Sequence, residues 1–188
     1  MTVLELLEEV QPATLSIGAQ APDFEDLLGV DGQRYGLSSF GDAPVLVLIF
    51  ASNRCPTVKA YEGRLRGLAD DYRDRGVQLV AINSNDPHLY PDESYERMVE
   101  FARDSGWSFP YLFDDGQVAA RAYGPQRTFH VFVLDADRRL RYEGRFDDAR
   151  IEERATSHDL RAALDDLLGG RVVANPSTRA FGCSIDFV

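Results

Sequence analysis

The sequence predicts a single α/β domain that spans the whole chain, residues 1–188. Two short apolar runs rich in β-branched residues, Val45–Phe50 and Val77–Ile82, are typical of strands buried on both faces. Apolar residues at spacings of three and four between them predict an amphipathic helix. A strand, a helix and a strand in this order imply that the two strands pair in parallel. A chain of 188 residues is long enough to bury a sizeable core in one domain.

The first third of the chain predicts a small β-ribbon at the edge of the fold. Leu4–Val10 has the pattern of one or two helical turns, which Pro12 ends. Asp31-Gly32 then stands between two short runs, Leu27–Val30 and Gln33–Leu37, and Asp-Gly in this position is a hairpin signal.

The predicted central helix begins at Cys55-Pro56 and runs to about Arg75, with Gly76 as its C-cap. Asn83–Pro87 leaves the carboxyl end of the following strand. In open α/β sheets such loops border the functional site, on the same edge as the helix that starts at Cys55. The helix positions that we expect to face the core are Val58, Tyr61, Leu65, Leu68 and Tyr72.

The second half of the chain predicts further alternating elements and a docked tail. The residues after Arg171 have few structural signals, but Ala180–Ile185 is too apolar for a free end. We therefore expect this tail to pack on the body of the protein. The expected elements before it are the helix Ser94–Ser105, the strand Phe109–Phe113, the helix Gln117–Tyr123, a hairpin of His130–Leu134 with Leu140–Phe146, and the helix His158–Leu168.

Composition excludes several classes of partner. The chain has 31 acidic and 20 basic residues, a formal net charge of −11, which disfavours nonspecific binding to nucleic acid or to anionic membranes. No apolar run approaches membrane-spanning length, and Met1–Val10 lacks the features of a signal peptide, so we expect a cytoplasmic protein. Cys and His residues at ligand spacing are too few to indicate a metal site, and we expect no cofactor.

Cys55 is the candidate nucleophile. At the start of a helix its sulfur would face unpaired backbone N–H groups and the positive end of the helix dipole, which both favour thiolate over thiol. Pro56 fits the first helical position because its missing N–H has no partner to lose there. We expect this sulfur to be ionised and open to solvent. The alternative is a buried, inert cysteine, since free Cys is among the most buried residue types.

Polar residues around Cys55 provide candidate supporting groups. Arg54 adjoins the sulfur in sequence, Ser52 places a hydroxyl three residues before it, and Lys59 lies one helical turn beyond it. Lys59 is the only lysine of the chain, which suggests a use for a compact ammonium group. A solvated position on the helix surface is the alternative for Lys59.

Five segments, in this order and spacing, give the chain a family resemblance. They are Ala21–Phe24, Cys55–Tyr61 with the pattern Cys-Pro-x-Val-Lys, Ala81–Asp86, Phe109–Leu112 and Phe181–Ile185. Together they resemble the peroxiredoxin-like branch of the thioredoxin superfamily, the alkyl hydroperoxide reductase/thiol-specific antioxidant relatives. The resemblance implies a thioredoxin-like fold, a central mixed sheet flanked by helices with an N-terminal β-ribbon and a docked C-terminal tail. It also implies a redox cysteine at Cys55.

The chain departs from these relatives around the cysteine. Val58 stands three residues after Cys55, so the dithiol with which thioredoxin resolves its own mixed disulfide is absent. Leu48 replaces the proline that typical peroxiredoxins have seven residues before the cysteine, while Ser52 fills their hydroxyl position. A copper-handling relative would need a second cysteine where this chain has Lys59, so we set that function aside.

A second departure lies at Arg127-Thr128-Phe129. Relatives often have Cys-Thr-Pro here, with a cis-proline packed against the active cysteine, and this chain has Arg and Phe in place of the Cys and the Pro. A non-proline cis bond costs about 3–4 kcal/mol, so we expect a trans peptide before Phe129. Arg127 is a candidate to point at Cys55 and lower its pKa, and a surface Arg paired with an acidic neighbour is the alternative.

These features predict a thiol-based oxidoreductase with peroxiredoxin-like antioxidant activity. The Cys55 thiolate would attack a peroxide oxygen or a disulfide sulfur. Cys183 is the candidate resolving thiol, and a thiol from another molecule is the alternative. We expect a thioredoxin-like or low-molecular-weight thiol as reductant, and a homodimer stays open. Candidate substrate-binding residues are Asn53, Arg54, Lys59, Asn83, Asn85, Asp86 and Phe129.

A function of another class stays open. The missing second cysteine and the missing cis-proline are also what a redox-inactive thioredoxin-fold binding module would have, because a fold does not determine a function.

Overall fold

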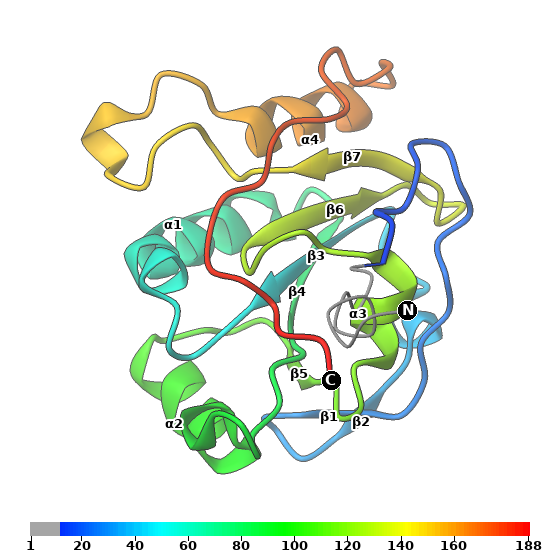
Figure 1. Cartoon of the computed structure of the whole chain (residues 1–188). Helices are drawn as coiled ribbons and strands as arrows, with labels where there is room; N and C mark the ends of the chain where they lie inside the picture. The colour runs from blue at the N-terminus through cyan, green and yellow to red at the C-terminus, as the bar shows by residue number, and fades with distance from the viewer. Residues whose placement is uncertain (1–11) are drawn as a thin grey trace, which may run out of the picture.

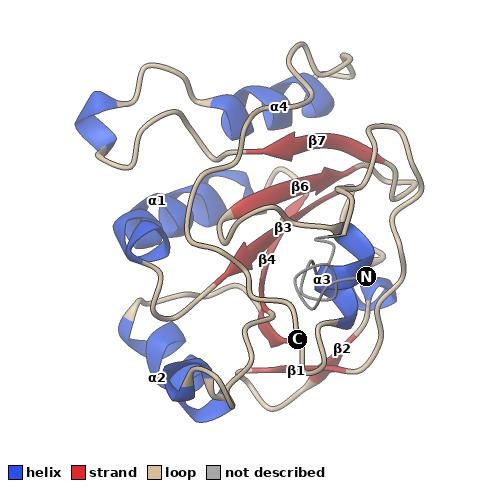
Figure 2. Cartoon of the chain, in the orientation of Figure 1, coloured by secondary structure: helices blue, strands red, loops and turns tan. Residues whose placement is uncertain are grey.

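The computed structural model describes residues 12–188, and the helical turns predicted at Leu4–Val10 lie outside these residues. The described chain is an α/β structure built on one mixed sheet of seven strands, in the order β2-β1-β5-β4-β3-β6-β7 (Figures 1 and 2). The α/β class predicted from the sequence is confirmed. The strands are β1 (Leu27–Gly29), β2 (Arg34–Tyr35), β3 (Val45–Ala51), β4 (Val77–Asn83), β5 (Tyr111–Phe113), β6 (His130–Leu134) and β7 (Leu140–Gly144).

The central strands pair as the sequence predicts. β3 runs parallel to β4, with Val47 opposite Leu79, and antiparallel to β6, with Phe50 opposite His130. The predicted β-ribbon of β1 and β2 forms one edge of the sheet, and β7 forms the other edge. The β6–β7 hairpin is also confirmed, although β7 ends at Gly144, two residues before the predicted end.

Helices cover both faces of the sheet, which explains the continuous apolar sequence of β3. Val47 and Ile49 pack into the core on the face of α1, α2 and α4, whereas Leu46 and Leu48 pack on the face of α3. The helices are α1 (Pro56–Arg73), α2 (Tyr95–Asp104), α3 (Val118–Tyr123) and α4 (Asp159–Leu168), with short 3-10 turns η1 (Leu37–Phe40), η2 (Pro91–Glu93) and η3 (Glu152–Arg154).

The predicted C-cap of α1 is wrong by two residues. The helix ends at Arg73 and Asp74 occupies the cap, whereas Gly76 lies in the turn that enters β4. Gly76 has φ +85°, and a Cβ there would come within 3.1 Å of Pro44, so the turn itself requires a glycine. All five α1 residues predicted to face the core are buried, namely Val58, Tyr61, Leu65, Leu68 and Tyr72.

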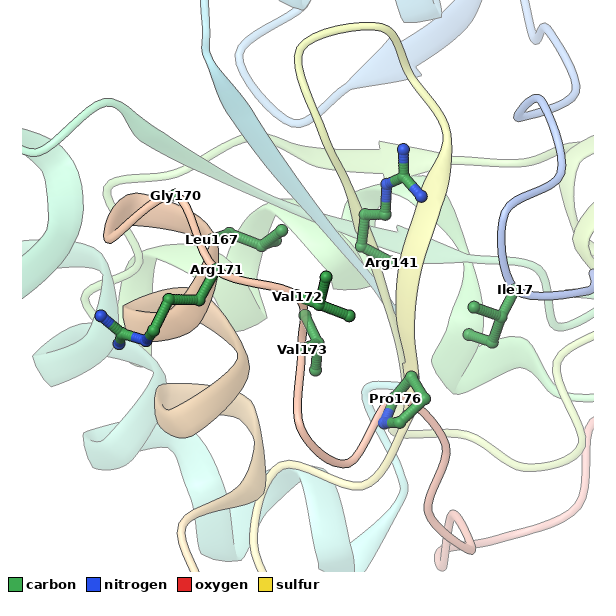
Figure 3. Close-up of a pocket in the computed structure, with 8 residues that line it drawn as sticks. All are labelled: Ile17, Arg141, Leu167, Gly170, Arg171, Val172, Val173 and Pro176. Atoms are coloured by element: carbon green, nitrogen blue, oxygen red, sulfur yellow. The ribbon is translucent and has the colours of Figure 1, made fainter.

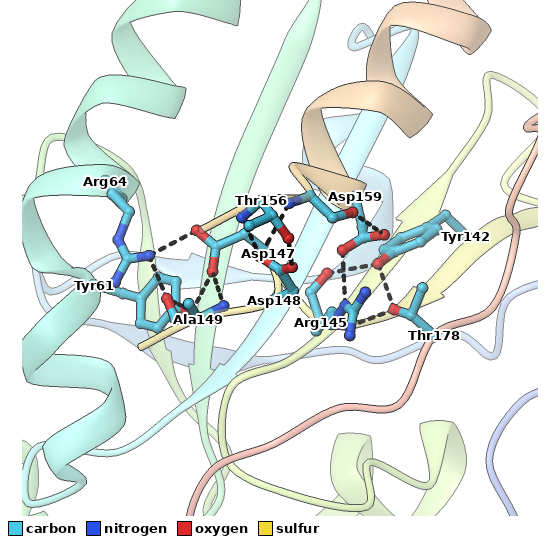
Figure 4. A network of polar contacts seen from close by, with 11 residues as sticks. Tyr61, Arg64, Tyr142, Arg145, Asp147, Asp148, Ala149, Thr156, Asp159 and Thr178 are labelled. Carbon is cyan, nitrogen blue, oxygen red and sulfur yellow. Dashed lines mark hydrogen bonds and ion pairs between the residues drawn. The ribbon is translucent and has the colours of Figure 1, made fainter. Parts of the chain in front are cut away.

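Polar contacts tie the loop after β7 to α1 (Figure 4). Arg64 forms a buried ion pair with Asp147 at 2.7 Å, and the Tyr61 hydroxyl donates to the same carboxylate. Arg64 also donates to the carbonyl oxygen of Ala149 at 2.8 Å, and the Tyr61 hydroxyl lies 2.9 Å from the same oxygen. Farther along, the hydroxyls of Tyr142 and Thr178 lie 2.7 Å apart, which joins this network to the C-terminal tail.

The C-terminal tail docks on the body, as predicted. In Figure 1 the red segment runs from β7 across the ends of the central strands to the region of α3. Backbone hydrogen bonds hold it at Thr178, whose N–H donates to Glu143, and at Cys183, whose carbonyl accepts from Thr128 at 2.9 Å. The backbone N–H of Val188 donates to the Gln117 side chain at 2.9 Å. The tail therefore crosses the sheet edge where Cys55 lies.

Candidate active site

Cys55 occupies the start of α1 that the sequence predicts. It is the N-cap residue, with extended backbone angles, and Pro56 is the first helical residue. The prediction of a solvent-open sulfur is wrong, because Cys55 is 1% exposed. Phe129, Phe181 and Cys183 belong to the same packed cluster, so the start of β6 and the tail enclose the thiol.

A threonine hydroxyl is the group that the sequence analysis missed. Thr128 Oγ1 lies 3.3 Å from the Cys55 sulfur and 3.2 Å from the carbonyl oxygen of Cys183. Its backbone N–H donates to that carbonyl as well. The sequence feature that could have identified Thr128 is its place in the Arg-Thr-Phe segment, where it matches the relatives and only the residues on either side differ from them. Thr128 thus connects the redox cysteine to the tail.

The environment of Cys55 favours the thiolate. Burial raises the pKa of its thiol and is the largest single effect, whereas the side chains of Cys183 and Thr128 lower it. The backbone N–H groups of Val58, in the first turn of α1, and of Cys183 lower it further. The net result is a Cys55 pKa below the ordinary value for cysteine, in spite of burial.

Cys183 is the second thiol of the site. It is half-buried, and both cysteines are free thiols in this structure. Burial and the hydrogen bond to Cys55, where a negative charge would sit, raise the pKa of Cys183 to about 11. The structure therefore brings the two cysteines together in one packed cluster, with the pKa of Cys55 lowered and that of Cys183 raised.

Ser52 does not provide the predicted hydroxyl beside the sulfur. Its Oγ donates to the carboxylate of Glu93, which also accepts from the backbone N–H of Asn53 and the side chain of Asn83, both at 2.8 Å. Glu93 is fully buried rather than a charge at the surface of its short helix, η2. Because three donors surround this carboxylate, Ser52 is committed to holding the turn between β3 and α1.

Arg127 was a candidate to point at Cys55, but its side chain contacts the tail instead. The only hydrogen bond of its side chain among residues 12–188 goes from Nη1 to the hydroxyl of Ser184, at 3.4 Å. Arg127 is not among the groups with the largest effects on the pKa of Cys55. Because the backbone turns at Thr128, the hydroxyl of that residue reaches the sulfur while the guanidinium group lies beside the tail.

The other two basic candidates lie at the rim. The Arg54 guanidinium stacks over the Tyr90 ring at 3.8 Å, and the Tyr90 hydroxyl donates to Asp186 of the tail. Arg54 also acts to lower the pKa of Cys183 through its charge. Lys59 is exposed on α1. Both cations are thus accessible from solvent on the segments that flank Cys55.

The predicted amide and carboxylate candidates serve mainly to shape loops. Asn53 accepts from Tyr111 at 2.9 Å and donates to the carbonyl of Asp92. Asn83 accepts from the backbone N–H of Asn85 at 3.0 Å, and Asp86 accepts from that of His88 at 2.7 Å. Asn53 and Asn83 are buried, so the structure does not present them to a ligand at the surface, whereas Asn85 and Asp86 line a small hollow of about 120 Å³.

Phe129 forms an apolar wall beside the cysteines. No peptide bond among residues 12–188 is cis, as the sequence predicts for the bond before Phe129. The residue instead has φ +76°, an unusual conformation for a bulky side chain. Its buried ring packs on Tyr61, with 4.5 Å between ring centroids. Packing of this ring holds the strained turn that presents Thr128 to Cys55.

Other features of the described residues do not suggest a different active site from the one at Cys55. An apolar hollow of about 420 Å³ is lined by Val172, Val173 and Leu167, and none of its lining residues belongs to the cysteine site (Figure 3). Within residues 12–188 no three His, Cys, Asp or Glu side chains form a cluster that suits a metal ion. Over the same residues, none of the helices combines the length and apolar character needed to cross a bilayer.

Comparison with known proteins shows several similarities over much of the chain. The protein resembles a hypothetical protein of Sinorhizobium meliloti 1021, at 40% identity, with 95% of this chain and 98% of that chain covered and a TM-score of 0.87. It is also similar to the thiol-disulfide oxidoreductase ResA of Halalkalibacterium halodurans, at 30% identity. That match covers 57% of this chain and 56% of the relative, so it spans little more than half of that protein.

A third similarity concerns the fold. The peroxidoxin BcpB of Mycobacterium tuberculosis, 21% identical, has a TM-score of 0.62 over 82% of this chain and 95% of that chain. This likeness confirms the thioredoxin-like fold. The family model described as Redoxin matches residues 16–164. The chain therefore belongs to the Redoxin family.

Proposed function

We propose that this protein is a thiol-dependent peroxidase in which Cys55 is the nucleophile and Cys183 the resolving thiol. The observation that carries this proposal is the position of the Cys55 sulfur, which accepts a hydrogen bond from Thr128 at 3.3 Å and lies in the same packed cluster as the second cysteine, Cys183. A thiolate held in this way, next to a second thiol, is the arrangement that two-step thiol oxidation requires. Membership of the Redoxin family supports this chemistry over a redox-inactive binding module.

The first step is attack of the Cys55 thiolate on one peroxide oxygen. The O–O bond breaks, the sulfur becomes a sulfenic acid, and the other oxygen leaves as water or an alcohol after taking up a proton. Thr128 can hydrogen-bond to the sulfur throughout this step. The Cys183 thiol then condenses with the sulfenic acid, which forms a Cys55–Cys183 disulfide and releases water.

Burial of Cys55 favours a small oxidant. At 1% exposure the sulfur offers little surface to a bulky disulfide, whereas a small peroxide needs only a narrow approach. An antioxidant role, a cytoplasmic location and regeneration by a thioredoxin-like or low-molecular-weight thiol are parts of the same proposal and rest on the sequence. A homodimer stays a prediction.

Intact-mass analysis after one equivalent of hydrogen peroxide tests the two cysteine roles. We expect the wild type to lose two hydrogens, and Cys183→Ser to gain one oxygen because its sulfenic acid has no partner thiol. Cys55→Ser, the matched control, should keep its mass. An unchanged mass in both the wild type and Cys183→Ser would overturn the proposal.

A further inference from the structure

A second hollow lies beside the cysteine site, between the loop before β6 and the tail. It has a volume of about 350 Å³. The residues of this arginine hollow that matter here are Arg127, Arg179, His130 and Glu143, and Ala180 closes its tail side. None of these residues except Arg127 was a candidate from the sequence.

The arginine hollow has a net positive charge in a strongly acidic protein. Neither Arg127 nor Arg179 pairs with a carboxylate among residues 12–188, and Arg179 makes no hydrogen bond there. The one carboxylate, Glu143, already accepts from Ser177 and from His130 Nε2, the latter at 2.6 Å. His130 Nδ1 accepts a backbone N–H at 2.9 Å, so the ring has its proton on Nε2. Two guanidinium groups thus remain available to an anion.

This hollow is adjacent to Cys183. The Arg127 side chain reaches Ser184, the residue after Cys183, at 3.4 Å. Thr128, the residue after Arg127, hydrogen-bonds to the Cys183 carbonyl. Cys183 is half-buried, whereas Cys55 is 1% exposed. Neither cysteine lines the arginine hollow, and Cys183 is the more exposed of the two to a molecule bound beside it.

We propose that the arginine hollow binds the carboxylates of a small anionic thiol, and that this thiol reduces the Cys55–Cys183 disulfide by attacking the sulfur of Cys183. This inference rests on the proposed function, which supplies the disulfide. Arginine binds a carboxylate through two parallel hydrogen bonds. A hollow of this volume fits a small-molecule thiol rather than the surface of a protein partner.

The reduction takes two exchanges. The thiolate of the first molecule attacks Cys183 Sγ, the S–S bond breaks, and the electron pair leaves on Cys55 as a thiolate. A mixed disulfide then joins Cys183 to the small thiol. A second thiolate attacks the sulfur of the bound small thiol. The small-molecule disulfide is released, and Cys183 leaves as a thiolate that takes up a proton.

The direction of attack agrees with the acidities of the two cysteines. In thiol–disulfide exchange the sulfur of lower thiol pKa leaves faster. The pKa of Cys55 is lowered and that of Cys183 is raised to about 11, so Cys55 is the better leaving group. Attack at Cys183 also returns Cys55 directly to the thiolate that the next peroxide requires.

Reduction kinetics with two probe thiols test this inference. The disulfide is first formed with hydrogen peroxide and verified by mass. Its reduction is then timed with mercaptosuccinate, which has two carboxylates, and with 2-mercaptoethanol, which has none. For each thiol the rate of the variant is divided by that of the wild type, which cancels the intrinsic reactivity of the thiol. We expect Arg127→Gln and Arg179→Gln each to slow the reduction of the disulfide by mercaptosuccinate about tenfold. Reduction by 2-mercaptoethanol should change little.

Arg103→Gln is the matched control, since Arg103 is exposed on α2 and pairs with Asp104. It should leave both rates unchanged. If Arg127→Gln and Arg179→Gln changed the reduction rates with the two thiols equally, or changed neither rate, the proposed role of the arginine hollow would be overturned. The peroxidase proposal would remain intact. Failure of the wild type to form the disulfide would overturn both, and the mass measurement shows which of these has occurred.

Discussion

The hydroxyl of Thr128 lies 3.3 Å from the sulfur of Cys55, and this contact links the nucleophile to the C-terminal tail. The same oxygen is 3.2 Å from the carbonyl of Cys183. A hydroxyl has one proton and donates more strongly to a charged acceptor, so ionisation of Cys55 draws this proton toward the sulfur. Thr128 therefore stabilises the thiolate form more than the thiol form.

Thr128→Val should raise the pKa of Cys55. A hydrogen bond to a charged group contributes about 1.5–3 kcal/mol, so we expect a rise of roughly one pKa unit or more. The pKa in the wild type is below that of ordinary cysteine, so its alkylation by iodoacetamide should begin at lower pH, and the variant should shift the profile to higher pH. Thr128→Ser retains the hydroxyl and should keep the wild-type profile. Identical profiles for Val and Ser would contradict this role.

Gly182→Ala should lift the tail from Cys55. Gly182 has φ +154°, and a Cβ there would collide with the carbonyl oxygen of Thr128. Overpacking of this kind costs about 1–3 kcal/mol, which should raise Cys55 alkylation at neutral pH roughly tenfold and slow disulfide formation. Gly63→Ala, at an exposed position of α1, is the control and should change neither rate. An unchanged alkylation rate in Gly182→Ala would show that the tail does not limit access.

Glu93→Gln should destabilise the turn between β3 and α1. The buried carboxylate accepts from Ser52, Asn53 and Asn83, and an amide would place its own NH₂ group among these donors. We expect a loss of about 3 kcal/mol in the free energy of unfolding, measured by chemical denaturation. Glu96→Gln, on the exposed side of α2, should change it by less than about 0.5 kcal/mol. Equal small effects would mean that Glu93 does not hold this turn.

Asp147→Asn should break the buried ion pair that ties the loop after β7 to α1. The Arg64 and Asp147 side chains are 7% and 1% exposed, so removal of one charge leaves the other buried without its partner. Such losses amount to about 3–5 kcal/mol. Asp104→Asn breaks an exposed pair with Arg103 and should cost less than about 1 kcal/mol in the same denaturation measurement. Similar costs for the two variants would contradict this account.

The position of Cys55 could be predicted because it depends on local order. An apolar run, a short turn and a proline at the first helical position place the cysteine at a helix start, and the structure has it there. The roles of Ser52 and Arg127 could not be predicted in this way. Each is near Cys55 in sequence or in the family pattern, but the side chain direction depends on a partner from another element, Glu93 for Ser52 and the tail for Arg127.

The sequence by itself determined the α/β class, the strand and helix order, the helix-start cysteine and the docking of an apolar tail. These follow from apolar periodicity, turn residues and composition, which act over a few neighbouring residues. Only the tertiary structure decided that the thiol is enclosed, that Thr128 is its hydroxyl partner and that Cys183 lies against it. Each of these depends on contacts between residues more than fifty positions apart. Patterns of neighbouring residues do not predict such contacts.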